Sequence, residues 1–313
     1  MNLIEFGDCR DTMRRWAGRG VKAQMCVTSP PYFGLRDYGH EGQIGLEQTP
    51  EQYIAAMVEV FRCVRDVLAD DGTLWLNIGD CYASGGRKTR DTDDKLAQRG
   101  MDTRPADPDG IKPKDLIGIP WMLAFALRAD GWYLRQDIIW HKPNPMPESV
   151  RDRCTKAHEY VFLLSKSGRY FFDSEAMRED AVKGASGSSF NTGKTAAHQM
   201  GRSSDAERVE DGKRNRRSVW TVATRPYKGA HFATFPPALV EPCVLAGSRP
   251  GDIVLDPFIG SGTTAAVALQ HGRQYLGCEL NTEYGALQAE RINEATEAVA
   301  EAAAQPDLFE RAA

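Results

Sequence analysis

The chain has 313 residues, 42% of them hydrophobic, and a formal net charge of −4, which allows one large α/β core and excludes a uniformly basic nucleic-acid binder. It has no run of about 18 apolar residues and it starts with a polar segment, so we expect neither a membrane span nor a signal peptide. Its seven cysteines lie apart along the chain, a distribution that favours reduced thiols and a cytoplasmic location over disulfides or a zinc site.

Hydrophobic periodicity predicts strands and helices that alternate along the chain. Pro50 opens a helix whose apolar residues recur at helical spacing, whereas the apolar run at 253–255 suits a strand inside a parallel sheet. The alternation predicts an α/β protein with a doubly wound, mostly parallel sheet. We expect strands over 3–6, 23–28, 73–78, 134–140, 160–165, 253–255 and 274–279, and helices over 9–16, 51–68, 117–128, 236–246, 265–271 and 283–300.

The turn Ser29-Pro30-Pro31-Tyr32 follows the predicted strand over 23–28. Two prolines stiffen this turn, because each fixes φ near about −65° and has no backbone N–H to donate. An amino group on a planar heterocycle is a poor nucleophile, because its lone pair is delocalised into the ring. Ser29 Oγ and the Pro30 carbonyl would accept the two amino protons while the Tyr32 ring stacks on the heterocycle. The alternative interpretation is an ordinary turn after a buried strand.

Two polar segments interrupt the pattern of strands and helices. Segment 84–115 has nearly balanced charges and little hydrophobic periodicity, which predicts a mobile loop. Segment 194–228 has nine basic and four acidic residues, so it carries +5 while the rest of the chain carries −9. Such a basic island suits an element that contacts phosphates, and a solvated loop is the alternative. Phe190, which precedes this segment, and Trp220 within it would anchor a small core, the interpretation we favour, or form an apolar wedge that inserts between bases.

A glycine-rich turn follows the predicted strand over 253–255. Gly260 and Gly262 allow the backbone to turn sharply and to approach a ligand closely. The spacing differs from the dinucleotide-binding fingerprint, which argues against a nicotinamide or flavin cofactor. The next strand ends at Glu279, about 20 residues after the turn, where doubly wound folds place an acceptor for ribose hydroxyls. A tight structural turn beside a surface glutamate is the alternative interpretation.

Two motifs resemble those of the amino-DNA methyltransferases, the adenine-N6 and cytosine-N4 family. Residues 28–32, TSPPY, resemble the catalytic motif, and residues 256–264, DPFIGSGTT, resemble the motif that binds S-adenosylmethionine. The catalytic motif comes first, an order that resembles the β subgroup, so the resemblance implies a circularly permuted, Rossmann-like methyltransferase sheet. Weaker similarity to other segments of the family lies at 4–9, 138–147, 158–164 and 231–237.

The resemblance implies a site-specific DNA methyltransferase of the kind found in restriction-modification systems. It would transfer a methyl group from S-adenosylmethionine to the exocyclic amino group of a flipped base, either adenine N6 or cytosine N4. Serine at position 29 is commoner among the cytosine-N4 enzymes, but the sequence leaves both bases open. An RNA or protein-amide methyltransferase and a non-catalytic DNA-binding relative are the alternatives. The family scheme needs no strong base, so we interpret His141 and His158 as structural or pocket-lining.

The same resemblance assigns the site residues, with the adenine near Asp8, the ribose on Glu279 and the methionine end along 256–264. The catalytic residues would be Ser29, Pro30, Pro31 and Tyr32. The cofactor would bind Asp8, Cys9, His231, Phe232, Asp256, Pro257, Phe258, Gly260, Ser261, Gly262, Thr263, Glu279 and Asn281. DNA would bind Arg202, Lys213, Arg214, Arg216 and Arg217, and we expect no metal site.

The resemblance also divides the chain into parts and names partners. The parts are a catalytic half (1–173, with the mobile loop 84–115), a target-recognition insert (174–227), a cofactor-binding half of the same domain (228–300) and a flexible tail (301–313). We interpret the loop as one that closes on DNA, and a disordered insertion without a role is the alternative. Double-stranded DNA is the implied partner, and a homodimer is implied because relatives of the subgroup are often dimers. In the tail, Gln305, Leu308 and Phe309 resemble the short peptide that binds bacterial sliding clamps. A tail that packs on its own domain is the alternative.

Overall fold

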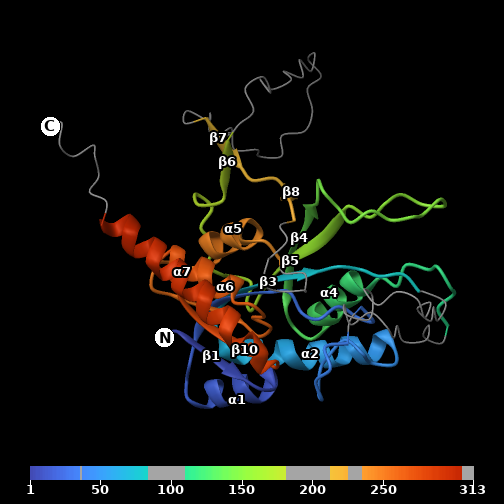
Figure 1. Cartoon of the computed structure of the whole chain (residues 1–313), viewed down its shortest axis with the longest axis horizontal. Coiled ribbons are helices and arrows are strands. Elements are labelled where there is room, and N and C mark those ends of the chain that lie inside the picture. Colours follow the sequence, from blue (N-terminus) through green and yellow to red (C-terminus); the bar gives the residue numbers. More distant parts are fainter. Residues whose placement is uncertain (36, 84–109, 181–211, 225–234, 305–313) are drawn as a thin grey trace, which may run out of the picture.

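The computed structural model describes residues 1–35, 37–83, 110–180, 212–224 and 235–304 (Figure 1). The strands are β1 (Leu3–Phe6), β2 (Ala23–Thr28), β3 (Leu68–Ile78), β4 (Tyr133–His141), β5 (His158–Ser165), β6 (Arg178–Asp180), β7 (Lys213–Asn215), β8 (Val219–Thr221), β9 (Ile253–Asp256) and β10 (Gln274–Glu279). The helices are α1 (Cys9–Gly18), α2 (Pro50–Val67), α4 (Ile119–Ala129), α5 (Pro237–Gly247), α6 (Thr263–Gln270), the 3-10 helix η1 (Thr282–Tyr284) and α7 (Gly285–Ala304).

All the predicted strands and helices are present, most of them within a few residues of the predicted ends. Helix α2 forms where Pro50 stands in its first turn and the Thr49 hydroxyl caps it by accepting from the backbone of Gln52. Strand β3 starts at Leu68 instead of residue 73, because Leu68 already pairs with Ala23 of β2. The prediction missed β6, β7 and β8, which have three residues each and lack a clear hydrophobic pattern.

Eight of the described strands form one sheet in the order β1-β10-β9-β2-β3-β5-β4-β8. All neighbouring pairs are parallel except those of β5, which runs antiparallel to both β3 and β4. This confirms the predicted mostly parallel sheet. The two parts of the chain meet at the centre, where Met25 and Cys26 of β2 pair with Val254 and Leu255 of β9. The turn at 29–32 and the glycine-rich turn after β9 therefore leave adjacent strands of one sheet.

The carboxyl ends of several strands lie at the same edge of the sheet. Because β3 and β4 are both antiparallel to β5, they run in the same direction as each other and as β2. Strands β2, β3 and β4 therefore end together at this edge, and β5 begins there with His158. In open α/β sheets, ligands bind at this carboxyl edge.

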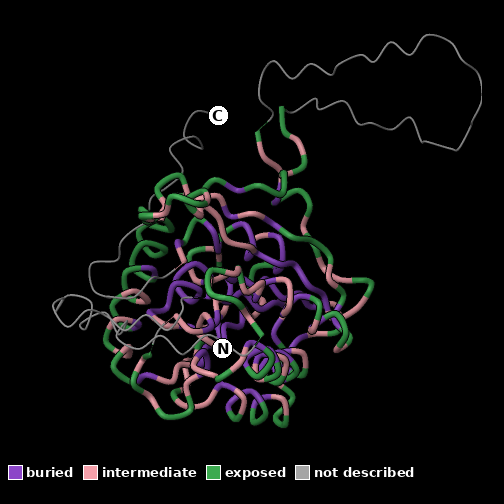
Figure 2. The backbone as a smooth tube through the Cα atoms, turned by 90° about the vertical axis from the view of Figure 1, so that its right-hand side faces the viewer, coloured by how far each residue is buried: buried purple, intermediate pink, exposed green. Residues whose placement is uncertain are grey.

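Helices cover both faces of the sheet and bury two apolar clusters (Figures 1 and 2). Helices α1, α2 and α4 pack on one face, around Trp16 and Phe61, and α5 and α6 pack on the other, around Trp75. Trp220 of β8 is 3% exposed, belongs to this second cluster and lies 6.4 Å from the Trp75 ring. It therefore belongs to the core of the main sheet, which corrects both the separate small core and the wedge. Phe190 lies outside the described residues.

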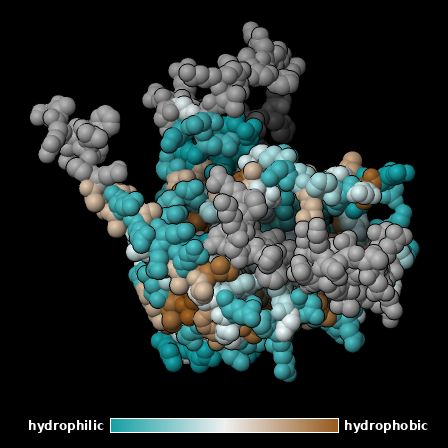
Figure 3. Space-filling view, in the orientation of Figure 1, coloured by the Kyte–Doolittle hydropathy of each residue, from teal (hydrophilic) through white to brown (hydrophobic). Residues whose placement is uncertain are grey.

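The outer surface is mostly hydrophilic on the face seen in Figure 3. Among the described helices, none combines the length and the apolar character that crossing a membrane requires.

Candidate active site

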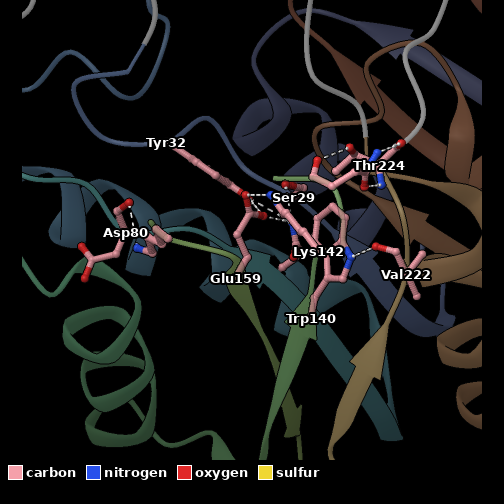
Figure 4. A network of polar contacts seen from close by, with 11 residues as sticks. Ser29, Tyr32, Asp80, Trp140, Lys142, Glu159, Val222 and Thr224 are labelled. Carbon is pink, nitrogen blue, oxygen red and sulfur yellow. Dashed lines mark hydrogen bonds and ion pairs between the residues drawn. The ribbon is translucent and has the colours of Figure 1, made fainter. Parts of the chain in front are cut away.

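The turn Ser29-Pro30-Pro31-Tyr32 lies at the carboxyl edge of the sheet, directly after β2 (Figure 4). The buried Tyr53 of α2 holds the turn in place, because its hydroxyl donates to the Pro31 carbonyl at 2.8 Å. Asn77 of β3 reaches the same turn, since its Nδ2 donates to Ser29 Oγ at 3.1 Å and to the Tyr32 hydroxyl at 3.0 Å. Two prolines and these three bonds hold Ser29 and Tyr32 in one arrangement.

The hydroxyl of Tyr32 donates to Oε2 of Glu159, the second residue of β5, at 2.7 Å. The other oxygen of Glu159 forms an ion pair with Lys142, whose ammonium group lies 4.2 Å from the centre of the Trp140 ring. Burial, reinforced by the nearby Glu159 carboxylate, raises the pKa of Tyr32 well above its ordinary value. The hydroxyl therefore stays protonated and remains a hydrogen-bond donor at neutral pH.

Gly79 leaves the space that the Tyr32 ring occupies. A Cβ atom at position 79 would lie 2.7 Å from Cε2 of Tyr32 and 3.3 Å from the Glu159 carboxyl carbon. Real Cβ atoms do not approach other heavy atoms so closely, so any larger residue would displace the ring. The absence of a side chain at Gly79 is thus part of how the structure positions Tyr32.

Sequence analysis indicated the segments that hold Lys142 and Glu159 but gave no role to either residue, nor to Asn77 or Gly79. The available signal was positional: all of them stand within two residues of a strand end at the carboxyl edge. His141 and His158, interpreted as structural or pocket-lining, are a directly paired couple across β4 and β5. Burial lowers the pKa of His158, so this histidine is neutral at neutral pH.

Asp256 connects the turn at 29–32, which we call the catalytic turn after its predicted role, to the glycine-rich turn after β9. Its fully buried carboxylate accepts hydrogen bonds from the hydroxyls of Thr28 and Thr264, both at 2.6 Å, and from the backbone N–H of Phe258 at 3.0 Å. Burial raises the pKa of Asp256 to about 6, against the opposite effect of these hydrogen bonds. Because Thr28 directly precedes Ser29, one carboxylate fixes the start of both motifs.

The glycine-rich turn has the geometry that its sequence predicts. Gly260 and Gly262 have φ of 51° and 86°, which favours glycine, and a Cβ atom at Gly260 would meet only the Phe258 carbonyl, at 3.9 Å. Helix α7 supports the turn from behind, since Gln288 Nε2 donates to the Gly260 carbonyl at 2.7 Å. Arg291 donates to the hydroxyl of Ser261 at 2.9 Å and also to that of Thr263.

Ser261 and Thr263 are both only 3% exposed, and their hydroxyls are engaged by Arg291. Pro257 is buried and Phe258 is partly exposed beside them. The hydroxyl groups of Ser261 and Thr263 are therefore occupied inside the protein, whereas the backbone of Gly260 is open.

Glu279 is the last residue of β10, and Asn281 follows two positions later, beside the glycine-rich turn. The Glu279 carboxylate accepts the backbone N–H groups of Gly260 and Asn281, each at 2.9 Å. Burial raises the pKa of Glu279 above its ordinary value. Each carboxylate oxygen has two lone pairs, so both oxygens keep capacity for a further donor such as a ribose hydroxyl.

Asp8 and Cys9 lie at the same edge, because the N–H of Gly7 donates to the Glu279 carbonyl at 2.8 Å. Asp8 caps α1 through the Arg10 N–H at 2.7 Å and pairs with the Arg10 side chain. Burial raises the pKa of the Cys9 thiol to about 12, so the thiol is uncharged. His231 and Phe232, also predicted to bind the cofactor, lie outside the described residues.

Basic residues of the predicted recognition insert gather around Glu179 of β6. Oε1 of Glu179 accepts from Arg214 at 3.0 Å and from Arg217 at 2.9 Å, so one carboxylate neutralises part of the charge of two guanidinium groups. Arg216 lies over the Trp220 ring, 4.7 Å from its centre. Lys213 is exposed on the strand that pairs with β6, and Arg202 lies outside the described residues. No cluster of potential metal ligands occurs among the residues that the structure describes.

The comparison with known sequences identifies the family. Residues 23–290 match the family model described as DNA methylase. The chain is 56% identical over 292 residues to the type II methyltransferase M.SmaI of Serratia marcescens, with 92% of this chain and 90% of the relative covered. It is 51% identical over 286 residues to the type II methyltransferase M.Cfr9I of Citrobacter freundii, with 91% and 86% covered.

Solved structures share the fold at much lower identity. The PvuII DNA methyltransferase, described as cytosine-N4-specific, has a TM-score of 0.61 at 17% identity, over 95% of this chain and 92% of that one. The complex of M1.HpyAVI with S-adenosylmethionine has a TM-score of 0.54 at 17% identity, over 94% of this chain and all of that one. The family match spans both the catalytic turn and the glycine-rich turn. The chain therefore belongs to the DNA methylase family and is an S-adenosylmethionine-dependent DNA methyltransferase.

Proposed function

We propose that Ser29, Pro30, Pro31 and Tyr32 carry out methyl transfer to the exocyclic amino group of a base in double-stranded DNA. The observation that carries this proposal is the bond between Thr28 and Asp256, which joins the catalytic turn to the cofactor turn at one sheet edge. An amino group lies within the base stack of a duplex, so the base must leave the stack to reach this edge. The named type II relatives support DNA as the substrate over RNA or a protein amide.

S-adenosylmethionine supplies an electrophilic methyl group when it is bound. The residues at the edge fit this molecule, because the backbone at Gly260 faces open space and the Glu279 carboxylate keeps free lone pairs. The backbone of the glycine-rich turn would hold the methionine end, Glu279 the ribose, and Asp8 would lie near the adenine. Ser261 and Thr263 contribute indirectly, through their bonds to Arg291.

In the catalytic turn, Ser29 Oγ and the Pro30 carbonyl accept hydrogen bonds from the two N–H groups of the target amino group. This arrangement localises the nitrogen lone pair and directs it toward the methyl group. The Tyr32 ring stacks on the base, held by Asn77 and Glu159, so most of the rate enhancement comes from positioning. The methylated nitrogen can lose its proton to water, so no described residue is assigned as a strong base.

DNA binding is assigned to the basic insert, with Lys213, Arg214, Arg216 and Arg217 as the described candidates. DNA phosphates would compete with Glu179 for Arg214 and Arg217. On binding, the insert would then replace these internal ion pairs with contacts to phosphates. The division at 1–173, 174–227 and 228–300 follows from the motif order. A homodimer, a cytoplasmic location and clamp binding through the tail, which lies outside the described residues, remain predictions.

Nucleoside mass spectrometry tests the proposal. The purified protein is incubated with bacterial genomic DNA and methyl-labelled S-adenosylmethionine, and the digested nucleosides are analysed. We expect label in N6-methyladenine or N4-methylcytosine, and the labelled nucleoside identifies the base. Sequencing of the modified DNA then identifies the recognition site. Label found only in RNA or protein supplied in a competition assay would contradict the proposal.

A further inference from the structure

We propose that Met146 is a wedge that enters the DNA helix when the target base leaves it. Met146 is 80% exposed, the largest value among the exposed large apolar side chains of the described residues. Apolar wedges, methionine included, insert between base steps in many DNA-bending proteins. This inference rests on the proposed function, because the gap that Met146 would fill is the one that the flipped target base leaves.

The loop that presents Met146 connects β4 to β5 over residues 142–157 and projects beside these strands in Figure 1. Its base is closed by the Lys142 N–H, which donates to the Ala157 carbonyl at 2.8 Å. Asn144 fixes the first part of the loop, because its side chain donates to the Thr224 carbonyl at 3.0 Å and accepts from the Thr224 N–H at 2.9 Å. The first part of the loop is therefore tied to the segment after β8.

The tip of the loop is stiff as well as exposed. Three prolines at 143, 145 and 147 alternate with Asn144 and Met146, and each fixes its own φ. The return part of the loop is held by Arg153, which donates to Glu148 at 2.5 Å and lies 4.0 Å from the centre of the Tyr82 ring. A rigid loop loses little conformational entropy when it inserts its tip.

The loop rises next to the proposed base pocket. Lys142, four positions before Met146, forms the ion pair with Glu159, and Glu159 holds the Tyr32 hydroxyl. Figure 4 shows Lys142, Glu159 and Tyr32 together at this edge. The loop therefore begins at the residue that pairs with Glu159, and Glu159 in turn positions the stacking ring.

The charge of the loop favours DNA over another protein as its partner. Residues 142–157 contain four basic and two acidic residues, a net charge of +2, and the rest of the chain carries −6. Arg151 is exposed near the tip, where it can reach a phosphate beside the opened step. An apolar tip within a basic loop matches the stacked bases and the phosphates of a duplex.

The test compares two duplexes that contain the methylation site mapped in the wild-type assay. In one the target base is paired, and in the other it faces a mismatched base that makes flipping easier. We expect Met146→Ala to lower the single-turnover rate about 10-fold or more on the paired duplex and less than about 3-fold on the mismatched one. Met146→Leu should retain most of the rate, and Val299→Ala, an exposed position on α7, serves as the matched control.

A fluorescent base analogue at the target position gives a second readout. We expect its fluorescence increase on binding to be smaller with Met146→Ala than with wild type or Val299→Ala. An equal loss of rate on both duplexes, no loss of rate on either, or an unchanged fluorescence increase would each overturn the wedge. A wild-type protein that methylates no DNA would instead overturn the proposed function, before any Met146 variant is measured.

Discussion

The catalytic turn and the glycine-rich turn lie at the same sheet edge but are held by different physical means. Glu159 and Lys142, whose side chains remain 16% and 18% exposed, support Tyr32 through charge. Fully buried Asp256 and the side chains of α7 support the glycine-rich turn from inside the protein. The glycine-rich turn is thus fixed by buried groups, whereas the turn that holds Tyr32 depends on charged groups that keep some contact with solvent.

A short hydrogen bond from the Thr28 hydroxyl to Asp256, at 2.6 Å, joins the two turns. It couples β2 with β9, the pair of strands where the two parts of the chain join. Variants on either side of this bond can therefore test whether the catalytic and cofactor functions are separable.

The largest effect is expected for Tyr32→Ala. Loss of the stacking ring should slow single-turnover methylation by about 1000-fold, equivalent to about 4 kcal/mol, because positioning of the base is lost. Tyr32→Phe keeps the ring and loses only the two hydrogen bonds of the hydroxyl, to Glu159 and from Asn77, so its rate should fall about 5-fold. Radiolabel transfer to DNA measures both rates. A normal rate for Tyr32→Ala would place the base pocket elsewhere.

Asp256→Asn tests whether a buried charge supports the cofactor half. The folded protein holds this proton up to pH of about 6, whereas the unfolded chain releases it near 3.8, so the free energy of unfolding falls as pH rises between these values. A pKa difference of about 2 corresponds to about 3 kcal/mol. Chemical denaturation at pH 4, 5, 6 and 7 should show this fall in the difference between the wild type and the variant, because the other carboxyl groups contribute equally to both. Equal pH dependence would show that Asp256 does not titrate as proposed.

Gly79→Ala tests the catalytic half through packing alone. The added methyl group would collide with the Tyr32 ring and tilt it, so we expect methylation to be about 10-fold slower with unchanged affinity for S-adenosylmethionine. Gly168→Ala is a matched control, since its Cβ atom would meet nothing closer than 3.6 Å. Equal rates for both variants would show that Tyr32 tolerates displacement.

The smallest effect is expected for Glu159→Gln. Glutamine keeps an oxygen that can accept from Tyr32 but removes the charge that faces Lys142. Because the pair is partly exposed, we expect only about a 3-fold lower rate. The pH profile of the single-turnover rate should keep its shape. A loss of 100-fold or a changed profile would show that Glu159 transfers a proton.

Much of the fold could be predicted because it depends on local pattern. Strand β10 has the predicted ends, since an apolar run between Gly272 and the Asn281 cap leaves little choice. Strand β8 was not predicted, because Val219 and Thr221 are exposed and only Trp220 faces the core. Its strand character comes from pairing with β4, a contact over 80 residues of sequence.

The candidate site likewise contains residues that the local sequence indicates and residues that it does not. Ser29 and Tyr32 could be proposed from their own motif, because two prolines define the turn that holds them. Glu159 lies 127 positions from Tyr32, and nothing in either local sequence indicates their hydrogen bond. Arg291 likewise reaches Ser261 only because α7 folds back behind the glycine-rich turn. Long-range contacts of this kind follow from the sheet order and not from sequence spacing.

The most direct test of the account compares Ser29→Ala with Gln288→Leu. For each variant, the dissociation constant of S-adenosylmethionine without DNA and the single-turnover rate at saturating cofactor are measured. We predict that Ser29→Ala lowers the rate at least about 100-fold with less than about 3-fold change in affinity, and that Gln288→Leu weakens affinity about 5-fold with a nearly normal rate. If either variant changed both quantities to the same extent, the two turns would not have separate roles.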